Sequence, residues 1–249
     1  MRRDSGSSSR IPSIRLRVSR SANWLVHALA AAACVIGGFA AATLGELGLT
    51  NQVTPGLVAS YTRRFGSGVR ERIASWVDFA RAQKSAPRAA RPETVGAELE
   101  SLQTVNAFFN RIPYLSDASH WGVEDYWATP AETVASHGGD CEDYSIAKYF
   151  LLKEFGVPVH RLRITYVKAM KLNQAHMVLA YYSAPDAEPL ILDNLEDRIR
   201  TASARPDLIP VYSFNDDDVV LARDPRKSSP RQIRAWHDLL QKLEAEAKL

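Results

Sequence analysis

Apolar residues have helical spacing through the first part of the chain. They recur every three or four positions over three long segments and one short one, which places them on one face of a helix. The short segment has Thr129 as a suitable N-cap residue and Pro130 in its first turn. The predicted helices cover residues 56–83, 95–110, 130–137 and 140–155.

The spacing changes after residue 160. β-branched and aromatic residues dominate four short runs that are separated by turn residues. These predicted strands cover residues 161–169, 175–183, 189–195 and 208–215. Helices followed by an antiparallel sheet predict an α+β domain. A charged, amphipathic helix begins at Ser229-Pro230, and we expect it to be a tail that faces solvent or a partner.

The start of the chain has the pattern of an export signal. Six arginines and one acid occupy residues 1–23, and no charged residue occurs from Trp24 to Gly45. Basic residues followed by an apolar run are typical of a secretory signal or an uncleaved membrane anchor. An A-x-A-like cleavage point lies near Ala42, but the run is also close to the length of a spanning helix. Both forms stay open, and both predict that the remainder is exported.

These patterns divide the chain into five segments. They are a basic cytoplasmic tail (1–23), a signal peptide or anchor (24–48), a helical segment with a linker (49–92), the main domain (93–222) and a C-terminal helical tail (223–249).

The charge distribution gives little support to a nucleic-acid partner. The formal net charge is +3 over 249 residues, but it comes from the N-terminal arginines. The remaining residues hold 25 Lys and Arg against 27 Asp and Glu, with no basic stripe. We therefore expect no binding to nucleic acid.

The chain has two cysteines, and only one lies outside the apolar run. Cys34 lies within that run and is expected to be a small hydrophobic residue there. An exported remainder with Cys141 alone has no internal disulfide, so its thiol is either reactive or shielded.

Three residues are placed as a nucleophilic site requires. Cys141 begins a predicted helix, His176 begins a predicted strand, and Asp193 lies on the next strand. A helix N-terminus stabilises a thiolate, and an imidazole can take the thiol proton and return it to a leaving group. A carboxylate on the other ring nitrogen orients the imidazole, and the Cys141 N–H is a natural oxyanion donor.

Six motifs in order resemble one known family. They are "DYWATPAE", "GDCEDYSIAKYFLL", "RITYVKA", "NQAHMVLAYY", "LILDNL" and "PVYSFN". Over roughly residues 95–215 the chain resembles the bacterial transglutaminase-like cysteine proteinases, the LapG family. The resemblance implies a papain/transglutaminase-like fold in which Cys141, His176 and Asp193 form the catalytic triad.

The resemblance also implies a biological role. The family consists of periplasmic endopeptidases that cleave the N-terminal region of a large repeat-containing surface adhesin at a di-alanine site. Cleavage releases the adhesin and promotes biofilm dispersal. A LapD-type inner-membrane receptor that senses cyclic di-GMP is the implied inhibitory partner.

Acidic residues around Cys141 present a separate problem, because negative charge normally raises a thiol pKa. The family is calcium-dependent, and its acids equivalent to Asp140 and Glu142 hold the ion, so the resemblance implies Ca²⁺ here. Asp143 is a further candidate ligand, since calcium prefers oxygen ligands. The alternative, that all three acids only cap the helix, stays open.

Two other functions stay open as well. A transglutaminase-type acyl transferase uses the same thioester on Cys141 and differs in whether an amine or water resolves it. A non-catalytic peptide-binding module is the third, although such a module need not keep a complete Cys–His–Asp set.

Overall fold

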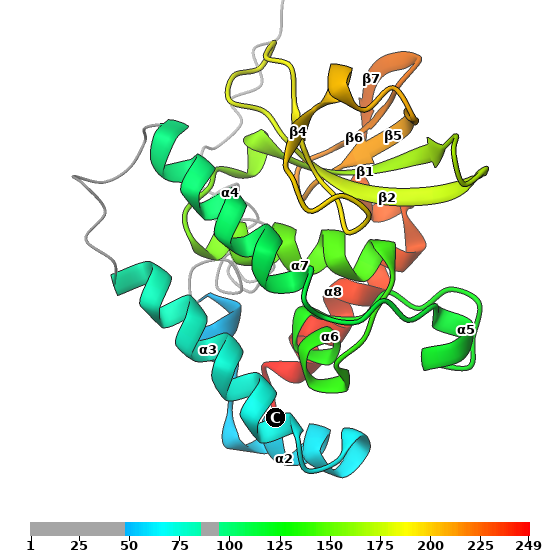
Figure 1. Ribbon diagram of the computed structural model, residues 1–249. Helices are drawn as coiled ribbons and strands as arrows, with labels where there is room; N and C mark the ends of the chain where they lie inside the picture. Colours follow the sequence, from blue (N-terminus) through cyan, green and yellow to red (C-terminus); the bar gives the residue numbers. More distant parts are fainter. Residues whose placement is uncertain (1–47, 86–94) are drawn as a thin grey trace, which may run out of the picture. The chain divides into compact units, whose positions relative to one another are not determined.

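Seven strands form one antiparallel sheet in the second half of the chain (Figure 1). Their order across the sheet is β4-β3-β2-β1-β5-β6-β7. The strands are β1 (Leu162–Ala169), β2 (Gln174–Tyr181), β3 (Leu190–Leu192), β4 (Arg200–Thr201), β5 (Leu208–Phe214), β6 (Val219–Leu221) and β7 (Asp224–Ser228). The four predicted strands are present, whereas β4, β6 and β7 are short strands that alternation did not reveal.

This computed structural model describes residues 48–85 and 95–249. The predictions for residues 1–47 fall outside the described residues. Within those two ranges, no helix is long and apolar enough to cross a membrane.

The helices precede the sheet, except for the last one. They are α2 (Pro55–Phe65), α3 (Val69–Ser85), α4 (Val95–Phe109), α5 (Asp117–His120), α6 (Pro130–Ser136), α7 (Cys141–Glu154) and α8 (Arg234–Glu246). Short 3₁₀ turns occupy Leu49–Gln52, Val159–Arg161, Ala202–Ala204 and Pro230–Gln232.

Two predictions about the helices were wrong. The single helix expected over 56–83 is two helices, because Gly66 ends α2 with a φ of 89°, a conformation that favours glycine. The residues between the predicted helices 95–110 and 130–137 have no helical spacing and were expected to form a loop, but they contain the one-turn helix α5.

The start of α6 is confirmed as predicted. Thr129 Oγ1 accepts a hydrogen bond from the Glu132 N–H at 3.0 Å, and the Thr129 N–H donates to Glu132 Oε2 at 3.1 Å. Pro130 occupies the first turn of this capping box, where its missing N–H costs nothing.

Helix α7 joins the helical and sheet parts. It packs on β2 and β1, and α4 and α6 pack against α7 in turn (Figure 1). Its residues from Tyr144 to Leu152 are almost all buried, so α7 lies in the core rather than at its edge. The Cys141 end of α7 is thereby fixed against the sheet.

The C-terminal helix is not the solvent- or partner-facing tail that the sequence suggested. Trp236, Leu239 and Leu243 on α8 belong to the main hydrophobic core. The Trp236 ring stacks on Phe150 of α7 at 5.6 Å and meets Phe214 of β5 edge-on at 5.3 Å. Charged residues on the opposite face of α8 produced the impression of a free helix, but its apolar face is covered.

Candidate active site and metal site

The segment before α7 lies close to the first turn of that helix. His137 ends α6 in the left-handed conformation, with φ of 59°. A Cβ at Gly139 would lie 2.8 Å from Asp143 Cβ, so only glycine permits this approach. The Gly139 carbonyl accepts a hydrogen bond from the Leu115 N–H at 2.9 Å. These contacts place Cys141 as the first residue of α7.

The Cys141 thiol lies between an acid and the sheet. It donates a hydrogen bond to Glu142 Oε2 at 3.0 Å. Burial raises its pKa well above the ordinary value, and the charges of Glu142 and Asp140 raise it further. The Met177 backbone N–H partly offsets the rise by hydrogen bonding to the sulfur. Cys141 is therefore a neutral thiol in this arrangement. Its sulfur lies next to Met177, the residue that follows His176 on β2.

His176 and Asp193 form the pair that the sequence predicted. His176 Nε2 lies 2.8 Å from Asp193 Oδ1, and both side chains are buried. Asp193 directly follows β3, which pairs with β2, so the sheet register brings the two residues together. Because Nε2 faces Asp193, Nδ1 is the nitrogen left to exchange a proton with a nucleophile.

Asp193 is held as a carboxylate. Burial, the largest single cause, acts to raise its pKa, while the hydrogen bond and charge of His176 act to lower it. The Leu195 N–H (3.0 Å to Oδ1) and Arg205 (Nη1 2.8 Å from Oδ2) add to this effect, and the pKa falls to about 2. Among the hydrogen bonds of the described residues, none joins Cys141 to His176, because the thiol points to Glu142.

Arg205 is a site residue that sequence reasoning missed. It is 8% exposed and also pairs with Asp207, Nη2 to Oδ2 at 3.1 Å. It follows the short turn after β4, where no periodic pattern marks it. Its role becomes clear only in the folded structure, where Arg205 lies between Asp193 and Asp207.

A group of carboxylates surrounds the start of α7. Oxygen atoms of Asp140 and Glu142 lie within 4.8 Å of each other and of the Cys141 sulfur. Two further triplets satisfy the same limit: Asp117 with Asp125 and Glu142, and Asp117 with Asp140 and Asp143. The three predicted ligands are thus brought together, with Asp117 and Asp125 from the segment before α6 added to them. We call these five residues the acid cluster.

Two oxygens of the acid cluster have no hydrogen-bond donor. Asp117 Oδ1 and Asp140 Oδ1 are both buried from solvent without a partner among the described residues. Burial is the largest cause that raises the pKa of Asp117 to about 6 and of Asp140 to about 8, and neighbouring acids add to it. Asp143, which is fully buried, has a pKa well above its usual range for the same reasons. Within residues 48–85 and 95–249, no Lys or Arg forms an ion pair with the cluster, although the charge of Lys242 on α8 acts to lower the Asp117 pKa.

This donor set fits calcium. The carboxylates supply only oxygen atoms, the ligands that hard cations prefer, and they come from two separate segments. A dication would satisfy the orphaned oxygens and cancel the repulsion between neighbouring acids. Asp117, Asp125, Asp140, Glu142 and Asp143 are the residues that can hold it.

Asp117 and Asp125 escaped sequence reasoning because neither lies near Cys141 along the chain. Asp117 lies on the one-turn helix α5, where its Oδ2 accepts a hydrogen bond from the Tyr126 N–H at 2.5 Å. The available signal was the presence of Asp117 and Asp125 among the aromatic residues before α6. Their sequence does not show that this segment passes the start of α7; the three-dimensional fold does.

Comparisons with known proteins agree with this architecture. The sequence profile described as bacterial transglutaminase-like cysteine proteinase BTLCP matches residues 70–207. The chain belongs to this family. A search of curated proteins finds no match.

Three solved structures of Legionella pneumophila LapG are similar to this cysteine proteinase. One has 38% identity and a TM-score of 0.63, and the match covers 77% of this chain and 98% of that one. An EGTA-treated form has 38% identity and a TM-score of 0.64 over the same shares. A calcium-bound form has 39% identity and a TM-score of 0.62, covering 77% and 99%. The transglutaminase-like α+β fold class is thereby confirmed.

Proposed function

We propose that this cysteine proteinase is a calcium-dependent endopeptidase that uses Cys141 as nucleophile, His176 as general base and Asp193 as the residue that orients His176. The main support for this proposal is the buried His176–Asp193 pair. His176 directly precedes Met177, whose backbone N–H contacts the Cys141 sulfur. A chain that only bound peptides would not need a buried, ionised acid on that imidazole.

The chemistry follows from these positions. His176 takes the Cys141 proton through Nδ1, and the sulfur attacks the carbonyl carbon of the scissile peptide. The Cys141 N–H, at the start of α7, is one donor for the resulting oxyanion. The imidazolium then gives its proton to the leaving amine, and water, deprotonated by His176, hydrolyses the thioester.

Calcium, when bound, would neutralise the acid cluster and so lower the cost of a negative sulfur beside Glu142 and Asp140. The support is the orphaned oxygens of Asp117 and Asp140, together with the calcium-bound form of the similar LapG. With a cation on its carboxylate, Glu142 would be a poorer acceptor for the Cys141 thiol and would hold it less strongly.

We infer a periplasmic location and a large repeat-containing surface adhesin as substrate, cleaved in its N-terminal region at a di-alanine site. Release of the adhesin would promote biofilm dispersal. A LapD-type receptor that responds to cyclic di-GMP is the proposed inhibitor. The support is the arginine-rich start followed by an uncharged run and the family to which the chain belongs.

The test mixes the full-length protein with the N-terminal fragment of such an adhesin and follows intact mass. Two fragments whose masses add up to substrate plus water are expected with calcium, and none with EGTA or with Cys141→Ala. His176→Ala should also be inactive, whereas His160→Ala, which changes an exposed histidine, should cleave normally.

Other masses would identify the alternatives. Higher-mass species that have lost ammonia would indicate acyl transfer to an amine. An unchanged mass with co-elution of the two proteins would indicate a binding module and would overturn the proposed reaction.

A further inference from the structure

The polypeptide between the acid cluster and α8 is held from both sides. Residues 126–128 run from Tyr126 to Ala128, just before the buried N-cap Thr129, and we call them the bridging segment. On one side, the Tyr126 N–H donates to Asp117 Oδ2 at 2.5 Å, and the Ala128 N–H donates to Asp143 Oδ1 at 2.7 Å. The bridging segment thus orients two carboxylates of the acid cluster.

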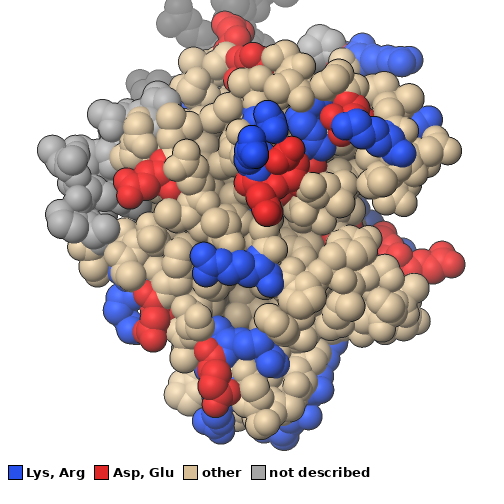
Figure 2. Space-filling view, in the orientation of Figure 1, with Lys and Arg blue, Asp and Glu red and all other residues tan. Residues whose placement is uncertain are grey.

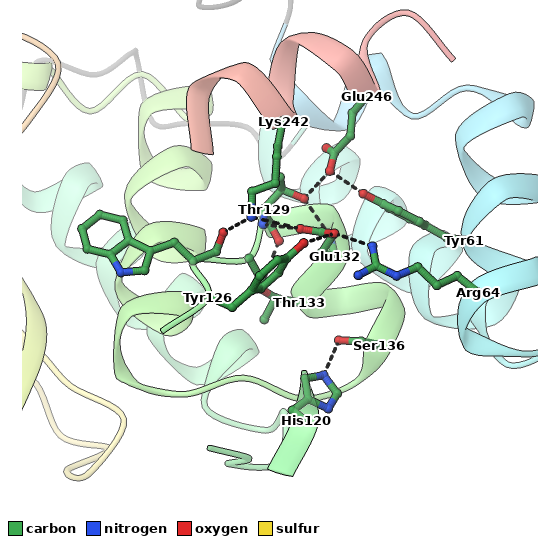
Figure 3. Close-up of polar contacts among 12 residues, drawn as sticks. Tyr61, Arg64, His120, Tyr126, Thr129, Glu132, Thr133, Ser136, Lys242 and Glu246 are labelled. Atoms are coloured by element: carbon green, nitrogen blue, oxygen red, sulfur yellow. Dashed lines mark hydrogen bonds and ion pairs between the residues drawn. The ribbon is translucent and has the colours of Figure 1, made fainter. Parts of the chain in front are cut away.

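The other side of the bridging segment is held by α8. Lys242 Nζ donates a hydrogen bond to the Trp127 carbonyl oxygen, and its ammonium lies 3.8 Å from the centre of the Tyr126 ring. Figure 3 shows Lys242 reaching from α8 toward Tyr126 and Glu132. Lys242 is therefore in contact with two of the three residues of the bridging segment.

One peptide group transmits this contact. The Trp127 carbonyl and the Ala128 N–H belong to the same planar trans peptide, whose C=O and N–H point in opposite directions. Lys242 binds one end of this plane, and Asp143 binds the other. A shift at the carbonyl therefore turns the N–H that orients Asp143, and a hydrogen bond at one end polarises and strengthens the other.

Lys242 is itself fixed by α6 and α2. Its Nζ lies 3.6 Å from Glu132 Oε2. Glu132 Oε1 accepts hydrogen bonds from Tyr126 Oη at 2.8 Å and from Arg64 Nη1 at 2.7 Å. The Glu132 side chain is only 4% exposed, whereas that of Lys242 is 30% exposed, so the acid is the buried partner of this ion pair (Figure 3).

We propose that Lys242 on α8 is a positioning residue for the calcium site, and that it acts through the Trp127–Ala128 peptide on Asp143. This inference rests on the proposed calcium dependence. It makes the C-terminal helix part of what determines calcium affinity, although α8 contributes no ligand to the acid cluster.

Two effects of Lys242 on calcium have opposite signs. As a positioning residue it strengthens calcium binding, whereas as a nearby cation it repels calcium. Glu132 Oε2 lies 3.6 Å from the ammonium and opposes its field, although the charge of Lys242 still acts to lower the Asp117 pKa. We expect positioning to dominate, because Lys242 binds the same peptide group whose N–H orients Asp143. Removal of Lys242 therefore weakens calcium binding if our inference holds and strengthens it if only charge matters.

The experiment measures the calcium Kd of metal-free full-length protein by calorimetry. Lys242→Met should raise the Kd by about tenfold, the low end of the loss caused by removing groups that orient metal ligands. Lys242→Arg, which keeps a donor and the charge, should restore most of the affinity. Arg234→Met is the matched control, because Arg234 is a 94% exposed cation on the same helix, and its Kd should be unchanged.

A measurement on the unaltered protein covers the case in which Lys242→Met does not fold. Binding linkage is reciprocal, so calcium must stabilise α8 if α8 stabilises calcium binding. Amide hydrogen exchange around residues 239–246 should therefore slow when calcium is added.

The outcomes separate the two proposals. Absence of calcium binding by the unaltered protein would overturn the proposed calcium dependence. Normal calcium binding with an unchanged or lower Kd in Lys242→Met would overturn only the role of Lys242. If that variant does not fold, the role of Lys242 would be overturned by amide hydrogen exchange in α8 of the unaltered protein that is equally fast with and without calcium.

Discussion

Glu246 near the end of α8 is an acid in an unfavourable place. Its Oε1 accepts hydrogen bonds from Tyr61 Oη of α2 and from the Thr129 hydroxyl (Figure 3). Burial is the main cause that raises its pKa to about 7, and the charge of Glu132 adds to the rise, while both hydrogen bonds and Lys242 oppose it. The variant Glu246→Gln keeps the acceptor oxygen and removes the titration.

The sign follows from proton binding. The folded-state pKa is about 7 and the ordinary value is 4.5, so the folded state binds more protons than the unfolded state between these values. The free energy of unfolding therefore has its full value below about pH 4.5 and falls as the pH rises through 7. Glu246→Gln should lack this fall.

The size of this change in the free energy of unfolding follows from the pKa shift of Glu246. A change from 4.5 to about 7 corresponds to at most roughly 3 kcal/mol, at about 1.4 kcal/mol per pH unit. The Glu246 residue is only partly buried, so solvent screening reduces this figure. We expect that Glu246→Gln gains roughly 1–2 kcal/mol over the unaltered protein between pH 5 and pH 8.

Urea unfolding of metal-free protein at pH 5, 6, 7 and 8 measures this difference, because other titrating groups cancel between the two proteins. Glu244→Gln is the matched control, since Glu244 is exposed on the same helix. A difference that stays constant over this range, or that grows in favour of the unaltered protein, would refute the reasoning.

Three further variants test other parts of the account. Asp117→Asn should raise the melting temperature of metal-free protein, because it removes a buried acid whose Oδ1 has no hydrogen-bond donor, and it should lower the further gain produced by calcium. Asp78→Asn, at an exposed ion pair, should change neither. Arg205→Met should move the acid limb of the profile of kcat/KM against pH to higher pH, because Arg205 helps to keep the pKa of Asp193 low. An acid limb at the same pH in this variant would count against that role. Trp236→Ala should lower the free energy of unfolding by about 3–5 kcal/mol in urea, as expected for a core aromatic residue, whereas a loss below about 1 kcal/mol would be that of a free tail.

Local patterns predicted much of the fold because each has a local cause. The start of α6 follows from the Thr129–Glu132 capping box and Pro130. The His176–Asp193 pair follows from two consecutive strands that are neighbours in the sheet.

Other features depend on contacts between distant residues, and the sequence pattern does not contain them. Asp117 begins the one-turn helix α5 and Arg205 follows a short 3₁₀ turn, so neither lies in a periodic segment, and only the fold brings them to the acid cluster and to Asp193. The charged face of α8 concealed Trp236, because an amphipathic helix has the same pattern whether its apolar side meets this core or a partner. The break at Gly66 was missed because the apolar spacing continues across it.

The most direct test of the account concerns the reactivity of Cys141. Its rate of alkylation by iodoacetamide should be measured from pH 5 to pH 9 by peptide mass spectrometry, which separates Cys141 from Cys34. With calcium, the account predicts at least about tenfold faster alkylation at pH 7, and loss of this gain in Asp117→Asn, because only the thiolate reacts. Equal rates with and without calcium, in protein shown by calorimetry to bind the ion, would contradict the claim that the acid cluster controls the nucleophile.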